Sequence, residues 1–192
     1  MNFRNRISAA VLILIVSVLT ACSAATPAAA PATSVAATPS GHNMDMSAPF
    51  DATFIDGMIV HHQGAITMAQ QALKEGQHPE LKQLAEAIVK AQQAEIDQMK
   101  QWRKAWYPGL KDTGGIMMDM GPMEVGKDTA TPFDIRFIKA MILHHESAVT
   151  MATEALQKAE HTEIKTLANA IIKSQGVEID QMRQWKAAWA TQ

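Results

Sequence analysis

Residues 50–65 read FDATFIDGMIVHHQGA, and residues 133–148 read FDIRFIKAMILHHESA. The similarity continues without a gap, because residues 50–106 align with residues 133–189 at a constant offset of 83, and 32 of the 57 positions are identical. This is too many identities for chance, and the lack of gaps keeps the helical registers of the two copies matched. The chain therefore contains one structural unit written twice.

Each copy has the apolar periodicity of two helices. In the first copy we expect one helix from about Pro49 to Lys74 and another from about Glu80 to Trp106, with a turn near residues 76–79. Apolar side chains recur at steps of three and four residues, which is the helical period. Four helices that each carry one apolar face most simply close into a four-helix bundle. The predicted fold class is all-α, a four-helix bundle built from two tandem helical hairpins.

The first 21 residues are typical of a lipoprotein signal peptide. Residues 9–19 form an apolar run that is too short for an ordinary membrane-spanning helix. The run ends in LTAC at residues 19–22, which looks like a lipobox, so we expect Cys22 to carry a lipid. The alternative is an ordinary secretory signal with an unrelated cysteine. Either way the protein is exported, and the lipid would anchor it to a bacterial membrane, with its domain in the periplasm or at the cell surface.

Composition divides the remaining chain into a tether, two repeats and a loop. Residues 22–47 are rich in Ala, Thr, Pro and Ser and lack the apolar side chains of a packed core, so we expect a disordered tether. The first hairpin repeat spans 48–107, a Met-rich connecting loop spans 108–131, and the second repeat spans 132–192. The repeats and loop form one domain, 48–192. A loop of this length is usually functional or disordered.

Charge and cysteine content exclude several classes of function. The net charge is −2, and removing Arg4 and Arg6 with the signal peptide lowers it to −4, so no basic footprint for nucleic acid exists. Because Cys22 is the single cysteine, the mature domain can form neither a disulfide nor a thiolate metal site. No phosphate-binding glycine loop or nucleophile elbow is present.

Polar residues that commonly bind metals lie on the apolar faces of the predicted helices. At 100° per residue Met58 points between His61 and His62, and a hairpin would bring Glu95 towards both histidines. A glutamate in an apolar stripe needs a partner. The set predicts a metal site of imidazole, carboxylate and thioether ligands. The alternative is a histidine–glutamate pair with methionine as core filler. The candidates in the two copies are Met58, His61, His62, Glu95, Met99, Met141, His144, His145, Glu178 and Met182.

Further methionines lie outside the predicted helices, where no hydrophobic face needs filling. They are Met44, Met46, Met117, Met118, Met120 and Met123. Their Met-x-Met and Met-Met spacings let several thioethers converge on one ion, and soft thioethers select Cu(I) and, by the same softness, Ag(I). The alternative is a mobile loop that docks through methionine. We expect these segments to bind metal.

The repeated motif resembles a known bacterial family. Phe-Asp-x-x-Phe-Ile-x-x-Met-Ile-x-His-His-x-x-Ala, followed by Met-Ala and then Gln-x-x-Glu-Ile-x-x-Met-x-x-Trp, is similar to the domain of unknown function 305 family in both halves. The resemblance implies a ferritin-like helical bundle that is often exported. It also implies a link to copper binding or copper tolerance in some members.

These observations predict an exported, lipid-anchored copper-binding protein that sequesters or relays Cu(I), with Cu(II) or Ag(I) as further ligands. Its expected partners are the metal ion, the membrane through Cys22, and a copper-handling protein of the cell envelope, but no nucleic acid. One alternative is a ferritin-like dinuclear metal oxidase, although neither copy has Glu-x-x-His in the expected place. The other alternative is a metal-free envelope scaffold. We expect a binding protein, not an enzyme.

Overall fold

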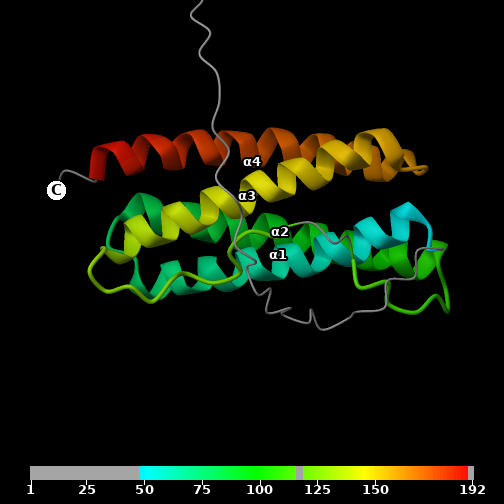
Figure 1. Cartoon of the computed structure of the whole chain (residues 1–192), viewed down its shortest axis with the longest axis horizontal. Helices are drawn as coiled ribbons and strands as arrows, with labels where there is room; N and C mark the ends of the chain where they lie inside the picture. The colour runs from blue at the N-terminus through cyan, green and yellow to red at the C-terminus, as the bar shows by residue number, and fades with distance from the viewer. Residues whose placement is uncertain (1–47, 116–118, 190–192) are drawn as a thin grey trace, which may run out of the picture. The chain divides into compact units, whose positions relative to one another are not determined.

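The computed structural model describes residues 48–115 and 119–189, and its helices form two hairpins (Figure 1). The helices are α1 (Phe50–Glu75), α2 (Pro79–Trp106), α3 (Phe133–Lys158) and α4 (Thr162–Trp189). The described residues contain no strand, so the prediction of an all-α, four-helix bundle is confirmed. None of the described helices is long and apolar enough to cross a membrane.

The two hairpins meet through their first helices. Helix α1 packs on α2 to form hairpin 1, α3 packs on α4 to form hairpin 2, and α1 lies along α3. Figure 1 shows that α1 and α3 run in opposite directions. Equivalent residues of the two copies therefore face each other near the middle of these helices.

The apolar core is split into two clusters, one towards each end of the bundle. Each cluster takes residues from all four helices: one is built around Met68, Phe137 and Met182, and the other around Phe54, Met99 and Met151. Along both α1 and α3, the segment between the clusters is the His-His dipeptide. The polar residues noted in the sequence thus form a layer across the middle of the bundle.

An aspartate of each hairpin caps the turn of the other hairpin. The Asp134 carboxylate accepts hydrogen bonds from the backbone N–H groups of Gln77 (3.0 Å) and His78 (2.9 Å), and from Nδ1 of His78 (2.6 Å). Asp51 makes the same three contacts, at 3.0, 2.9 and 2.6 Å, with residues 160–161. Since backbone N–H groups need acceptors, the turns that precede α2 and α4 each depend on an aspartate of the other hairpin.

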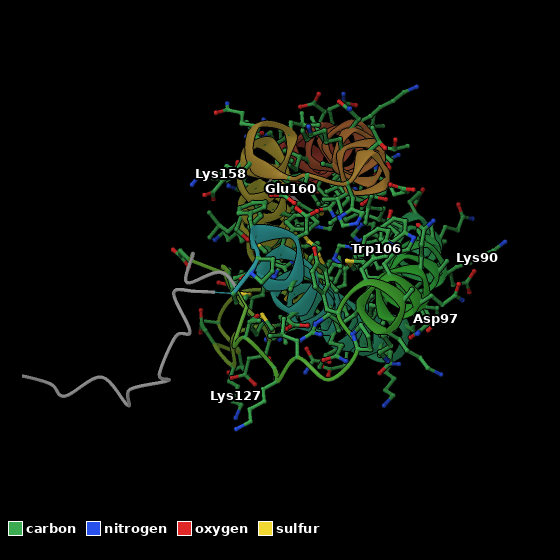
Figure 2. All side chains as sticks on the ribbon, turned by 90° about the vertical axis from the view of Figure 1, so that its right-hand side faces the viewer. Lys90, Asp97, Trp106, Lys127, Lys158 and Glu160 are labelled. Atoms are coloured by element: carbon green, nitrogen blue, oxygen red, sulfur yellow. The ribbon has the colours of Figure 1, made fainter. Side chains whose placement is uncertain are left out.

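Indole rings extend these caps. The His78 ring stacks on Trp189 with 3.7 Å between ring centroids, and His161 stacks on Trp106 at 3.8 Å. Figure 2 shows Trp106 between the hairpins, whereas Lys90 projects outwards. We call each Asp–His–Trp set an end clamp. The two end clamps lock the hairpins in register and so position the histidine layer between them.

Candidate metal centre

The centre of the bundle holds four histidines with no solvent exposure. They are His61 and His62 on α1 and His144 and His145 on α3, and we call them the histidine layer. The rings of His61 and His144 stack on each other with centroids 3.7 Å apart. The centroids of the adjacent His61 and His62 rings are 6.2 Å apart and the ring planes are inclined at 64°, so the two side chains of one dipeptide point in different directions.

His61 turns towards hairpin 2. Its Nε2 lies 2.7 Å from the Ser147 hydroxyl oxygen and 3.1 Å from the His144 carbonyl oxygen, and the Ser147 hydroxyl itself donates to that carbonyl at 2.8 Å. A hydroxyl that is already donating can only accept from His61. The Nε2 atom of His61 therefore carries the proton, and its Nδ1 atom presents a lone pair.

His62 and His145 turn instead towards the second helix of their own hairpin. Nε2 of His62 donates to Glu95 at 2.6 Å, and Nε2 of His145 donates to Glu178 at 2.7 Å. The prediction that Glu95 approaches both histidines of its hairpin is therefore correct for His62 only. A carboxylate on one ring nitrogen fixes the tautomer and raises the basicity of the other nitrogen, which is how metal-binding histidines are usually held.

Three imidazole nitrogens of the layer have no hydrogen-bond partner within the described part of the chain. They are Nδ1 of His61, His62 and His145, and all are buried. The side-chain oxygens of Gln92 and Gln175 are buried without a partner in the same way. A buried polar atom without a partner destabilises the folded state. Each of these bare nitrogens is chemically suited to a cation that prefers imidazole.

Burial controls protonation of the stacked pair. Burial, assisted by the neighbouring imidazoles, lowers the pKa of His61 to about 2. Burial, assisted by His145, lowers the pKa of His144 to about 4, although hydrogen bonds to the Pro122 and His61 carbonyl oxygens oppose this. Both rings are therefore neutral at pH 7, as ligands must be.

The connecting loop reaches the histidine layer. Nδ1 of His144 lies 2.9 Å from the Pro122 carbonyl oxygen. A Cβ atom placed on Gly64 would lie 2.6 Å from the sulfur of Met123 and 3.2 Å from Cε1 of His144, so this thioether occupies the space beside Gly64 next to the imidazole. The predicted loop site and the predicted bundle site are thus neighbours at Met123.

The other predicted ligands fall into separate places. Met58 and Met99 lie in one core cluster and Met141 and Met182 in the other, all without exposure. Met120 is half-buried. The predicted ligands Met44, Met46, Met117 and Met118, the predicted lipidation site Cys22, and the predicted segments 1–21 and 22–47 lie outside the described residues. In the described ranges, no three His, Cys, Asp or Glu side chains are grouped as a metal site.

Some residues of this centre escaped sequence reasoning. Ser147 has no chemical signal in the sequence, but it bonds His61 of the other hairpin. Asp51 and Asp134 lie in the first turns of α1 and α3, where a single acidic residue is commonplace. Both aspartates recur at the same position of each copy, together with His78 and His161. That shared recurrence is the one signal from which the end clamps could have been found.

Comparison with known proteins places this geometry in a family. The family described as "Domain of unknown function (DUF305)" matches residues 43–103. A protein named CopM, solved in Cu(I)-bound and Cu(II)-bound forms, is similar at 40% and 41% identity, with TM-scores of 0.62 and 0.63. The match covers 72% of this chain and 96% or 97% of CopM. CopM has also been solved in silver-bound forms.

Two further relatives are more distant or shorter. A DUF305 fragment from Deinococcus radiodurans is 25% identical, has a TM-score of 0.62, and is matched over 97% of its length by 73% of this chain. The uncharacterized protein L153 of Acanthamoeba polyphaga mimivirus is 43% identical over 49 residues, which is 26% of this chain. The chain spans about a third (32%) of the length of that curated relative.

Proposed function

We propose that this chain, which belongs to the domain of unknown function 305 family, is an exported, lipid-anchored protein that binds copper and sequesters or relays Cu(I) in the cell envelope. Cu(II) and Ag(I) are further ligands in this proposal. The ion is its cargo. The protein acts by holding the ion away from water and from other molecules.

The observation that carries the proposal is the set of three partnerless Nδ1 atoms of His61, His62 and His145. Hydrogen bonds from the opposite ring nitrogens to Ser147, Glu95 and Glu178 orient these lone pairs. In this arrangement the two glutamates position the imidazoles instead of binding the ion themselves. Copper binding would satisfy nitrogens that are otherwise buried without a partner.

The methionines give the proposed site its preference for soft ions. The sulfur of Met123 lies beside His144, and the loop that carries it also contains Met117, Met118 and Met120. Thioether ligands favour Cu(I) and Ag(I) over hard cations. The forms in which CopM has been solved, with Cu(I), Cu(II) and silver, support the same ligand class.

The test is a competition titration of the whole chain with Cu(I) and a chromogenic Cu(I) chelator. The variant His62→Gln/His145→Gln keeps an N–H donor near Glu95 and Glu178 but removes both Nδ1 atoms. We expect its Cu(I) affinity to fall by about tenfold or more, because the variant removes two of the three oriented, partnerless Nδ1 atoms. Lys90→Gln/Lys173→Gln changes two exposed residues at equivalent positions of the two hairpins, outside the layer and the end clamps, and is the control.

A second variant changes Met117, Met118, Met120 and Met123 to Leu and separates the loop from the layer. Loss of Cu(I) affinity in this variant alone would assign the binding site to the loop thioethers. Equal losses in the histidine variant and in its control would remove the layer from the proposal. No Cu(I) binding by the wild-type chain would overturn copper handling and leave the metal-free scaffold, whose melting temperature copper would not change.

A further inference from the structure

The outer surface of hairpin 1 carries an ion pair that further hydrogen bonds hold in place. Nε of Arg103 donates to Asp56 at 2.8 Å, and Nη2 of Arg103 donates to the other oxygen of the same carboxylate at 3.2 Å. That second oxygen also accepts from the backbone N–H (3.0 Å) and the hydroxyl (2.9 Å) of Thr113. One carboxylate therefore joins α1, α2 and the start of the connecting loop.

This ion pair holds an extended segment of chain against the hairpin. Arg103 also donates to the carbonyl oxygens of Leu110 (3.2 Å) and Lys111 (2.8 Å). Further along, a Cβ atom on Gly115 would lie 2.5 Å from Cα of Gly57, so the two backbones are in direct contact. The surface of hairpin 1 is thus a platform on which the chain after α2 lies.

Hairpin 2 has a different pair of charges at the equivalent place. At the offset of 83, Lys139 is the counterpart of Asp56, and Lys186 is the counterpart of Arg103. Two ammonium groups cannot pair with each other, and neither lysine makes a hydrogen bond or ion pair among residues 48–115 and 119–189. The two lysines line a pocket of about 390 Å³ whose other lining residues are Ile142, Leu143, Glu146 and Arg183.

Neighbouring charges do not neutralise the two lysines. Arg183 is paired with Glu146 at 2.7 Å, which accounts for the one carboxylate of the pocket. Asp128 lies within electrostatic range of Lys139, but its closer partners are Ala130 and Thr131. The pocket thus has two free positive charges and, in Leu143, an apolar side chain that is 54% exposed.

We propose that this surface, the Lys139–Lys186 pocket, binds an extended acidic segment of a partner protein. A carboxylate of the partner would have the role that the Asp56 carboxylate has in hairpin 1, and it would accept hydrogen bonds from both lysines. An apolar neighbour in the segment would cover Leu143. Anionic membranes are less suited to this pocket, because lipid surfaces are recognised by clusters of four to eight basic residues.

The probe is a fluorescein-labelled peptide of alternating Glu and Leu, with a Gln-Leu peptide as its neutral counterpart. Binding to the whole chain, held in mild detergent at low salt, is followed by fluorescence anisotropy. We expect the acidic peptide to bind about tenfold or more tightly than the neutral one, since charge-assisted hydrogen bonds carry the contact. Added salt should weaken the binding.

The decisive variant is Lys139→Asp/Lys186→Arg, which rebuilds in hairpin 2 the ion pair of hairpin 1. It adds a pair and breaks none, so lost binding cannot be ascribed to unfolding, and a circular dichroism melt checks this. We expect it to abolish peptide binding. Lys90→Asp makes the same change in net charge on an outward-facing site of α2 and should leave binding unchanged.

Three results would overturn the proposal. The first is equal affinity for the acidic and neutral peptides. The second is an equal loss of binding in Lys90→Asp and in Lys139→Asp/Lys186→Arg, which would mean diffuse charge attraction. The third is binding to vesicles of anionic phospholipid that depends on Lys139 and Lys186, without peptide binding, which would assign the pocket to the membrane.

Discussion

The two hairpins share more than half of their aligned residues, yet they differ at several positions that the connecting loop touches. Gly64 of hairpin 1 leaves space for Met123, whereas its counterpart Ser147 in hairpin 2 bonds His61. Asp56 of hairpin 1 accepts hydrogen bonds from Thr113 of the loop, whereas its counterpart Lys139 makes no hydrogen bond to the loop residues that the structure describes. A single loop cannot contact both halves of a repeat in the same way. Equivalent positions of the two hairpins therefore have different surroundings.

The two hairpins remain equivalent at the end clamps and at their histidine–glutamate pairs. The end clamps repeat the same three distances at Asp51 and Asp134, and the pairs His62–Glu95 and His145–Glu178 agree within 0.1 Å. Their geometry comes from helix packing, which is the same in both halves. The comparison therefore separates residues that stabilise the bundle from residues whose contacts depend on the loop.

The largest expected effect is acid lability without metal, and it distinguishes the two stacked histidines. Their pKa values of about 2 and about 4 lie below the ordinary 6.5, so between pH 4 and 6.5 the unfolded chain binds more protons than the folded one. The free energy of unfolding should fall as the pH falls from 6.5, by about 3 kcal/mol per pH unit for the two together. Below pH 4 only His61 still contributes.

Urea unfolding between pH 4 and 7 measures this slope, and NMR titration of the imidazoles assigns it. The variant His61→Gln/His144→Gln should lose most of the slope. A titration of either ring near pH 6.5 in the folded protein would show that water reaches the layer and would contradict its burial.

The next effect tests whether the two end clamps are equivalent. Asp51→Ala and Asp134→Ala each leave a partly buried histidine and two backbone N–H groups without their acceptor. We expect each change to lower the free energy of unfolding by about 3–5 kcal/mol. Urea unfolding followed by tryptophan fluorescence measures the loss, because the indoles stack on the same histidines. Asp97→Ala, at an exposed site, is the control.

A large difference between the two aspartate variants would break the proposed equivalence of the ends. It would mean that the loop stabilises one clamp more than the other, in spite of their matching distances.

The smallest effect concerns the space beside Gly64. Gly64→Ser gives hairpin 1 the side chain that hairpin 2 has, and its Cβ would displace the Met123 thioether, which lies 2.6 Å away. Because the end of a methionine side chain is flexible, we expect a stability loss of only about 1 kcal/mol. Met123 should, however, be oxidised faster by hydrogen peroxide, as peptide mass spectrometry can measure.

The reverse change, Ser147→Gly, does not touch the space around Met123 and is the control for oxidation. An unchanged oxidation rate in Gly64→Ser would show that Met123 does not depend on that space.

Much of the bundle could be predicted from the repeat. The two helices of the first copy were expected at about Pro49–Lys74 and Glu80–Trp106. The observed ends of α1 and α2 differ from these bounds by no more than one residue. Helical periodicity is a local property, so a single chain suffices to read it. The histidines were also expected on the buried faces, and they are buried.

The partners within the site were harder to predict. Sequence spacing placed Glu95 opposite the dipeptide as a whole, but only the antiparallel contact of α1 and α3 turns His61 away from it. The same contact brings Ser147 to His61. These are contacts between segments more than eighty residues apart, and neither periodicity nor spacing contains the angle at which two helices meet.

The sequence by itself determined the repeat, the four amphipathic helices, and the burial of the histidines, because each follows from local periodicity. Only the tertiary structure decided which nitrogen of His61, His62 and His145 keeps a free lone pair, which hairpin caps which turn, and which of two equivalent surfaces the loop covers. These outcomes depend on differences of a few tenths of an ångström in the distances between segments that are far apart in the chain. Such distances are set by packing the whole bundle at once.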